Sequence, residues 1–172
     1  SLWTTVMLII TSVLLSKINK IKIVFKNKQK IFTLLFSGIL IFTNWAVWIY
    51  AVSTDRVIDA SFGYFIMPII SIFLGYFFFK ETLSSKGKLS VIIVIFSILL
   101  LFFLDLKSIP WVGLIVAFSW SFYNLLRKKV SVETDIGLLL ESLFILPVIL
   151  ISFYFIIQNN VNDFDISNPK LM

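Results

Sequence analysis

Six continuous apolar runs, separated by short polar connections, organise the 172-residue sequence. They lie at residues 1–16, 31–52, 57–79, 89–104, 110–126 and 136–157. About 20 helical residues are enough to cross the hydrocarbon core of a bilayer, whereas membrane strands alternate apolar and polar positions over about ten residues. The pattern therefore predicts an all-α integral membrane protein, a polytopic bundle of six transmembrane helices.

The runs differ in length. The second, third and sixth are long enough to span outright, while the fourth and fifth need a thinner bilayer or flanking side chains that reach outward. The first run begins at once with Ser1, with no Met and no charged segment before it, so it does not resemble a signal peptide. We expect the sequence to be an internal piece of a longer protein.

Cationic residues fall in every second connection. Twelve of the fifteen Lys and Arg residues lie in segments 17–30, 80–88 and 127–135. Cytoplasmic connections of membrane proteins carry an excess of Lys and Arg. The alternation therefore predicts that these three segments lie in the cytoplasm and that the chain starts on the outer side. We expect a multi-pass protein of the bacterial inner (plasma) membrane.

Composition excludes several classes of function. With 59% hydrophobic and 14% charged residues, the chain has too much apolar surface for a water-soluble domain. It has no His and no Cys, so we expect no metal site, no cofactor and no enzymatic activity. The net charge is +6, but the lysines are spread over separate connections and form no single basic face, which argues against nucleic-acid binding.

One face of run 57–79 is small, polar or kinked. At helical spacing it spans an arc of roughly 80° and holds Ala60, Tyr64, Pro68, Ser71 and Gly75. Pro68 has no backbone N–H, so it frees the carbonyl of Tyr64 one turn earlier. The stripe predicts either the wall of a substrate cavity or a close helix–helix contact through small residues.

Two further groups are candidates for contact with a solute. They are Asn44 and Trp48 in run 31–52, and Trp120, Tyr123 and Asn124 in run 110–126. A buried amide such as Asn44 either contacts a substrate or makes an interhelical hydrogen bond. The second group shares one helix face, and an aromatic surface with one amide suits a planar or amphiphilic solute.

Glu141 is the one carboxylate well inside an apolar run. A charge at this depth is costly unless it is paired, solvated or neutralised, which makes Glu141 a candidate for proton coupling. It also lies only about 9 Å from the inner end of its run at the helical rise. The alternative is therefore a structural role, in which Glu141 points to cytoplasmic water or to Arg127–Lys129.

Several strings along the chain resemble one family of permeases. They are Asn44-Trp45 with Tyr50-Ala51-Val52, residues 59–68 ending in Gly-Tyr-Phe-Ile-Met-Pro, Lys80-Glu81-Thr82-Leu83, Ser108-Ile109-Pro110-Trp111, and residues 122–129. This pattern resembles the RarD-type permeases, EamA proteins of the drug/metabolite transporter superfamily. Met67 stands where that family usually has Asn before the proline.

The resemblance implies ten helices in two inverted five-helix repeats, of which the six runs would be helices two to seven. Residues 1–107 would then be most of the first repeat, and residues 108–172 the start of the second. Because each repeat has an odd number of helices, runs 1–16 and 136–157 should point in opposite directions, as the loop charges also indicate.

We therefore expect a secondary transporter that moves a small metabolite or drug-like solute by alternating access. Its cavity would be lined by runs 31–52, 57–79 and 110–126. The expected partners are a small-molecule substrate and the lipid bilayer, and a homodimer is a compatible assembly. Two alternatives remain: a non-transporting membrane scaffold, and a membrane-embedded lipid-modifying protein.

Overall fold

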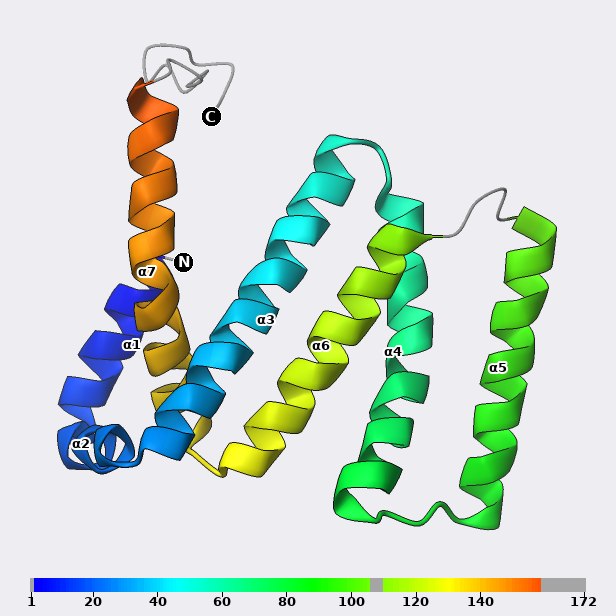
Figure 1. The fold of residues 1–172 in the computed structure, drawn as a ribbon, viewed down its shortest axis with the longest axis horizontal. Coiled ribbons are helices and arrows are strands. Elements are labelled where there is room, and N and C mark those ends of the chain that lie inside the picture. The colour runs from blue at the N-terminus through cyan, green and yellow to red at the C-terminus, as the bar shows by residue number, and fades with distance from the viewer. Residues whose placement is uncertain (1, 106–109, 159–172) are drawn as a thin grey trace.

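The computed structural model describes residues 2–105 and 110–158, and these fold into seven helices with no strand among them (Figure 1). The helices are α1 (Leu2–Leu14), α2 (Ile18–Lys26), α3 (Lys28–Ser53), α4 (Val57–Phe79), α5 (Ser85–Asp105), α6 (Trp111–Val130) and α7 (Thr134–Gln158). Each of the six predicted apolar runs coincides with one of these helices. The all-α prediction is therefore confirmed for the described residues.

The segment 17–30 is not the plain connection that the charge pattern predicted. It contains α2 and the first turn of α3. The spacing of Ile18, Ile21 and Val24 gives α2 an apolar face, and Val24 is buried among residues of three other elements. The lysines had marked the segment as polar, but three of them, Lys20, Lys22 and Lys26, lie on the other faces of a short amphipathic helix.

Helices distant in the sequence lie side by side. α6 packs between α3 and α4, α7 packs against the other side of α3, and α1 packs against α7. α5 contacts α4 at the far end of the row (Figure 1). As a result, α3 is sandwiched between two helices that follow it by more than fifty residues.

Two buried apolar clusters hold this row together at opposite ends. One contains Val24, Leu34, Val130, Ile136 and Leu140, and the other contains Ala51, Ala60 and Val112. Each cluster joins residues from at least three elements. The apolar contacts therefore fix which helices are neighbours at both ends of the bundle.

α4 and α6 run in the same direction and approach very closely. A Cβ added to Gly113 would lie 2.3 Å from the carbonyl oxygen of Asp59, and one added to Gly63 would lie 2.3 Å from the carbonyl oxygen of Gly113. Only glycine leaves room for two backbones this close. The pair of glycines therefore sets the separation of α4 and α6.

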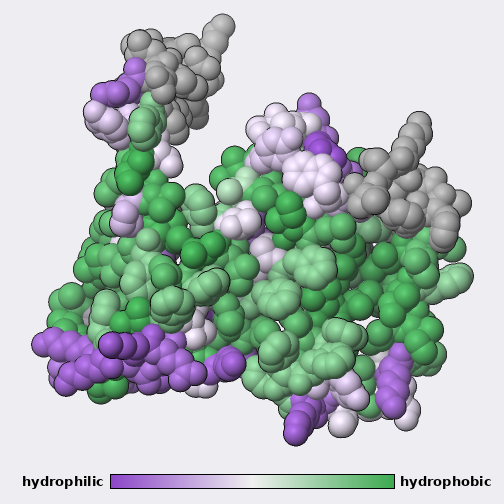
Figure 2. Space-filling model, in the orientation of Figure 1, coloured by the Kyte–Doolittle hydropathy of each residue, from purple (hydrophilic) through white to green (hydrophobic). Residues whose placement is uncertain are grey.

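The three lysine-rich connections lie at one end of the molecule, at the bottom of Figure 1. Figure 2 shows hydrophilic surface along this end and a hydrophobic band above it. Many large apolar side chains of the helices are exposed on the band, Trp45, Phe73 and Phe96 among them. Such a band is the surface expected of a protein that faces lipid.

By length and composition, three helices qualify as membrane spans: α3, α4 and the Thr134–Phe155 part of α7. Residues Trp3–Leu14 form a shorter apolar helix. The predicted boundary between repeats, at residues 107–108, lies outside the described residues, as does the segment 159–172.

Candidate functional site

Glu141 lies inside the bundle on α7, and only 2% of its surface is exposed. Ser37 of α3 donates a hydrogen bond to its Oε1 at 2.5 Å, and Tyr123 of α6 donates one to its Oε2 at 3.3 Å. The Nη1 of Arg127 lies 3.6 Å from Oε1. Side chains from three helices thus form one buried polar group, the Glu141 cluster (Ser37, Tyr123, Arg127 and Glu141).

Two glycines make room for the Glu141 cluster. A Cβ on Gly38 would lie 3.4 Å from the carbonyl oxygen of Glu141, so α3 and α7 are in tight contact there. A Cβ on Gly137 would lie 1.6 Å from Nη1 of Arg127. The guanidinium therefore occupies the space that any other side chain at position 137 would fill.

Charge neutralisation explains why this cluster is stable in an apolar bundle. Nη1 of Arg127 is buried and has no hydrogen-bond partner, so Glu141 is the charge that balances it. Nη2 of Arg127 donates to the carbonyl oxygen of Thr134 at 3.2 Å. A buried ion is tolerated when it is paired with a charge of opposite sign.

Glu141 also borders a pocket, the α3–α7 pocket, which has a volume of about 700 Å³. It lies between α1, α3 and α7, and its walls are Thr4, Ile41, Phe42, Trp45, Ala46, Ile49, Leu138, Glu141, Ser142, Ile145 and Ile149. Most of these side chains are apolar. Volume and lining fall in the range typical of small-molecule sites, roughly 300–1,000 Å³.

A smaller pocket, the α4–α6 pocket, lies near the lysine-rich end and has a volume of about 190 Å³. The predicted residues Ser71 and Asn124 both line it, together with Ser121. The hydroxyl of Ser71 donates to that of Ser121 at 3.3 Å. Ser121 in turn donates to the carbonyl oxygen of Met67 at 3.2 Å, one residue before Pro68.

The other predicted cavity residues line neither pocket. The Asn44 amide is buried and donates to the carbonyl oxygen of Val116 and to the hydroxyl of Ser119, each at 3.0 Å. It therefore makes the interhelical contact that was one of its two predicted roles. Whether it also meets a solute stays a prediction.

The predicted aromatic residues pack in pairs. Trp48 and Tyr64 meet edge to face with ring centroids 5.5 Å apart, and Trp120 lies 5.7 Å from Tyr123. Tyr64 and Pro68 are exposed on α4, whereas Ala60 and Gly75 of the same stripe are buried. The structure thus brings Tyr123 to Glu141 but does not bring the whole α4 stripe to one cavity.

Sequence patterns missed Ser37 and Gly137, whereas Arg127 had been named within the Arg127–Lys129 segment to which Glu141 could point. Arg127 had been assigned to a cytoplasmic connection, yet it lies in α6 with its side chain 12% exposed. The available signal was that Arg127 is the sole arginine in the three lysine-rich segments. Arginine suits buried ion pairs better than lysine does.

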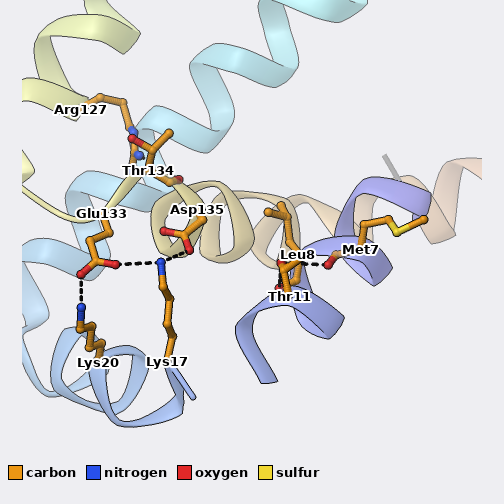
Figure 3. A network of polar contacts seen from close by, with 9 residues as sticks. All are labelled: Met7, Leu8, Thr11, Lys17, Lys20, Arg127, Glu133, Thr134 and Asp135. Carbon is orange, nitrogen blue, oxygen red and sulfur yellow. Dashed lines mark hydrogen bonds and ion pairs between the residues drawn. The ribbon is translucent and has the colours of Figure 1, made fainter. Parts of the chain in front are cut away.

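A second polar network joins the start of α2 to the connection before α7 and to the first turn of α7 (Figure 3). Lys17 pairs with Asp135 and, at 3.0 Å, with Glu133, while Lys20 pairs with Glu133. The hydrogen bonds to Asp135 and Glu133 raise the pKa of Lys17 above its usual value. The hydrogen bonds from Lys20 and Lys17 lower the pKa of Glu133.

Among the described residues, no group of three or more acids could hold a metal ion. The α3–α7 pocket can bind a small molecule, and the Glu141 cluster can change its ion pairing or protonation. Long apolar helices, a hydrophobic band and a buried charge cluster define a polytopic α-helical membrane protein.

The chain belongs to the EamA-like transporter family, whose sequence model matches residues 1–103. Together with its bacterial relatives and apolar helices, this makes it a multi-pass protein of the bacterial inner membrane.

Three relatives illustrate the similarity. The chain is 34% identical to the protein RarD of Escherichia coli over 161 residues, 94% of this chain and 54% of that protein. It is 39% identical to the protein RarD of Salmonella typhi over 129 residues, 75% and 44% of the two chains. It is 38% identical to the uncharacterized transporter YojE of Bacillus subtilis over 125 residues, 73% and 42%.

The chain spans about half the length of these curated relatives. No solved structure is a significant match to it.

Proposed function

We propose that the protein is a secondary transporter that moves a small metabolite or drug-like solute across the inner membrane by alternating access. The observation that carries this proposal is the buried Glu141 cluster at the wall of a mostly apolar 700 Å³ pocket. A hydrophobic pocket with few polar groups suits an amphiphilic solute. A charge cluster between helices suits a site that changes its pairing as the helices move.

The solute path would use the α3–α7 pocket, with the small α4–α6 pocket as a second polar position near the cytoplasm. Glu141 would couple transport to protons by exchanging its partner Arg127 for a proton. The protein would catalyse no covalent chemistry. Membership of a transporter family supports this class over a lipid-modifying enzyme or a scaffold.

The same proposal includes the number of membrane spans and the repeat to which each belongs. All six long helices would cross the membrane, as helices two to seven of a ten-helix inverted repeat. The first repeat would end and the second begin near residues 107–108. Opposite directions for α1 and α7, which Figure 1 displays side by side, are what an odd number of helices per repeat requires.

The test is solute flux in proteoliposomes that contain the full-length protein and an imposed pH gradient. Wild-type flux of at least one solute in a metabolite and drug panel should depend on the gradient. Glu141→Gln should lower that flux at least tenfold and remove its pH dependence. Asp55→Asn makes the same carboxylate-to-amide change in an exposed connection and should leave flux unchanged.

Two results would count against the proposal. If flux and pH dependence are unchanged in Glu141→Gln, Glu141 has a structural role alone. If the wild-type protein moves no solute under any ion gradient, the scaffold alternative is favoured.

A further inference from the structure

The helix α2 forms a fixed corner with the first turn of α3. One residue, Asn27, separates the two helices, and its side chain accepts a hydrogen bond from the backbone N–H of Lys30 at 3.1 Å. Val24 anchors the corner in the apolar cluster at this end of the bundle. Because the cap and the anchor lie within four residues of each other, the direction of the chain is well defined here.

Two lysines of this region form ion pairs with carboxylates, and three exposed lysines form none among the described residues. Lys17 and Lys20 pair with Glu133 and Asp135 (Figure 3). Lys22, Lys26 and Lys28 are exposed, and the part of the chain that the structure describes gives none of them a carboxylate partner. The sequence has no Asp or Glu before Asp55, so α2 and the start of α3 carry no acidic residue of their own.

Apolar side chains are exposed beside these lysines. Ile18, Ile23 and Phe25 of α2 have 46%, 67% and 49% of their surfaces exposed. In Figure 2 the corresponding end of the molecule carries hydrophilic surface directly below the hydrophobic band. A helix with apolar and cationic faces at the edge of such a band has the character of an interfacial membrane helix.

We propose that the corner formed by α2 and the start of α3 binds the anionic headgroup of an inner-leaflet phospholipid. Lys22, Lys26 and Lys28 would contact the phosphate, and the exposed Ile and Phe side chains would contact the adjoining acyl chains. Charge complementarity favours this occupant, since each lysine near an anionic leaflet adds to binding. The ion pairs of Lys17 and Lys20 would position α2 without taking part in lipid binding.

The experiment measures lipid adducts on the full-length protein by native mass spectrometry in a neutral detergent. Phosphatidylglycerol and phosphatidylcholine with matched acyl chains are titrated separately. The wild type should prefer phosphatidylglycerol. The triple variant Lys22→Gln, Lys26→Gln, Lys28→Gln should bind phosphatidylglycerol about tenfold or more weakly, and the corresponding Lys→Arg triple should keep wild-type binding.

A matched control removes the same charge elsewhere on the same end. The triple variant Lys80→Gln, Lys86→Gln, Lys88→Gln changes three exposed lysines around the α4–α5 connection. It should keep the preference for phosphatidylglycerol. Inorganic phosphate at the concentration of the lipid should not compete, because it offers no acyl chain.

Three outcomes would overturn the proposal. Equal loss in both Gln triples would mean that net charge alone attracts lipid. Full competition by inorganic phosphate would mean a general anion site. Unchanged binding in the Lys22, Lys26 and Lys28 triple would mean that lipid does not bind at this corner.

Discussion

Glu141 and Arg127 depend on each other because each is a charge removed from water. Glu141 has two hydroxyl donors besides the guanidinium, whereas Nη1 of Arg127 has no hydrogen bond at all. Removing the carboxylate would therefore leave the buried Nη1 of Arg127 without any polar partner. Removing the guanidinium would still leave the Glu141 carboxylate with two hydrogen bonds. The hydroxyls of Ser37 and Tyr123 can stabilise Glu141 in either of its charge states.

The ion pair predicts that removing one charge destabilises the protein more than removing both. Glu141→Gln should lower the free energy of unfolding by about 3–5 kcal/mol, because it leaves Arg127 as an uncompensated buried charge. The double variant Glu141→Gln, Arg127→Gln should recover part of this loss. Thermal unfolding of the purified full-length protein in detergent measures both.

A double variant no more stable than Glu141→Gln would contradict this account of the pair. It would mean that Arg127 is solvated independently of Glu141.

Sequence could identify Glu141 and, through the Arg127–Lys129 segment, one possible partner, but it could not identify Ser37 or show that Arg127 is buried. A lone acid within an apolar run is visible from the pattern of residues, and so is its depth from the helix end. Ser37 lies 104 residues away in the chain, and Arg127 adjoins two surface lysines. Their meeting depends on α7 packing against α3 beside α6, which no local pattern encodes.

At the scale of elements, the parallel contact between α4 and α6 rests on glycine. The pairs Gly63 with Gly113 and Ser71 with Ser121 run in the same order along both helices. The two backbones touch near the end opposite the lysine-rich connections, while the small α4–α6 pocket opens near the lysine-rich end. Small residues let helices approach within a membrane, where no hydrophobic force drives them together.

Gly113→Ala should destabilise the protein by about 1–3 kcal/mol, despite the better helix propensity of alanine. The new Cβ would meet the backbone oxygen of Asp59 at 2.3 Å, and a backbone in a helix cannot yield as a side chain can. Thermal unfolding in detergent reports the change.

Gly87→Ala is the matched control, since its Cβ would meet only side-chain atoms, at 3.4 Å or more. It should be neutral or slightly stabilising. Equal effects of the two substitutions would refute the close contact between α4 and α6.

The network that holds α2 should respond to acid. The lowered pKa of Glu133 means that its ion pairs stabilise the folded arrangement above the pKa of the free side chain, near 4.5. This stabilisation is lost as the pH falls through the lowered pKa of the folded state. The raised pKa of Lys17 keeps its charge throughout this range.

Spin labels at Asn19 and Ser131 can follow this change as an interspin distance. The distance distribution should be narrow at neutral pH and broaden in acid, below the pH at which Glu133 is protonated. Glu133→Gln should give a broad distribution already at neutral pH. A distribution that stays narrow in acid would show that the Glu133 pairs do not hold α2.

Most elements were predictable because each apolar run is continuous and bounded by charged or turn-forming residues. The exception is α2, whose lysines concealed its apolar face. Its helical spacing of Ile18, Ile21 and Val24 was present in the sequence, but a nine-residue amphipathic helix resembles a charged connection when only apolar run length is considered.

At the scale of the whole molecule, the order of helices could not be derived from their order in the sequence. Insertion of α6 between α3 and α4 buries the Ala51, Ala60 and Val112 cluster and completes the Glu141 cluster. Both outcomes need contacts between residues about fifty or more positions apart. The sequence did predict that the three lysine-rich connections lie together at one end of the bundle (Figure 1), whereas the side of the membrane that this end faces stays a prediction.

The proposed transport path requires that this lysine-rich end faces the cytoplasm. The sequence contains no cysteine, so single Cys substitutions within it can report accessibility once any others in the full-length protein are replaced. Asn19, Thr82 and Ser131 lie at the lysine-rich end, and Thr54 lies in the α3–α4 connection at the other.

A membrane-impermeant thiol reagent should label intact spheroplasts at Thr54→Cys but not at Asn19→Cys, Thr82→Cys or Ser131→Cys until the membrane is permeabilised. Labelling of any of the last three in intact spheroplasts would place that connection outside and contradict both the topology and the transport path.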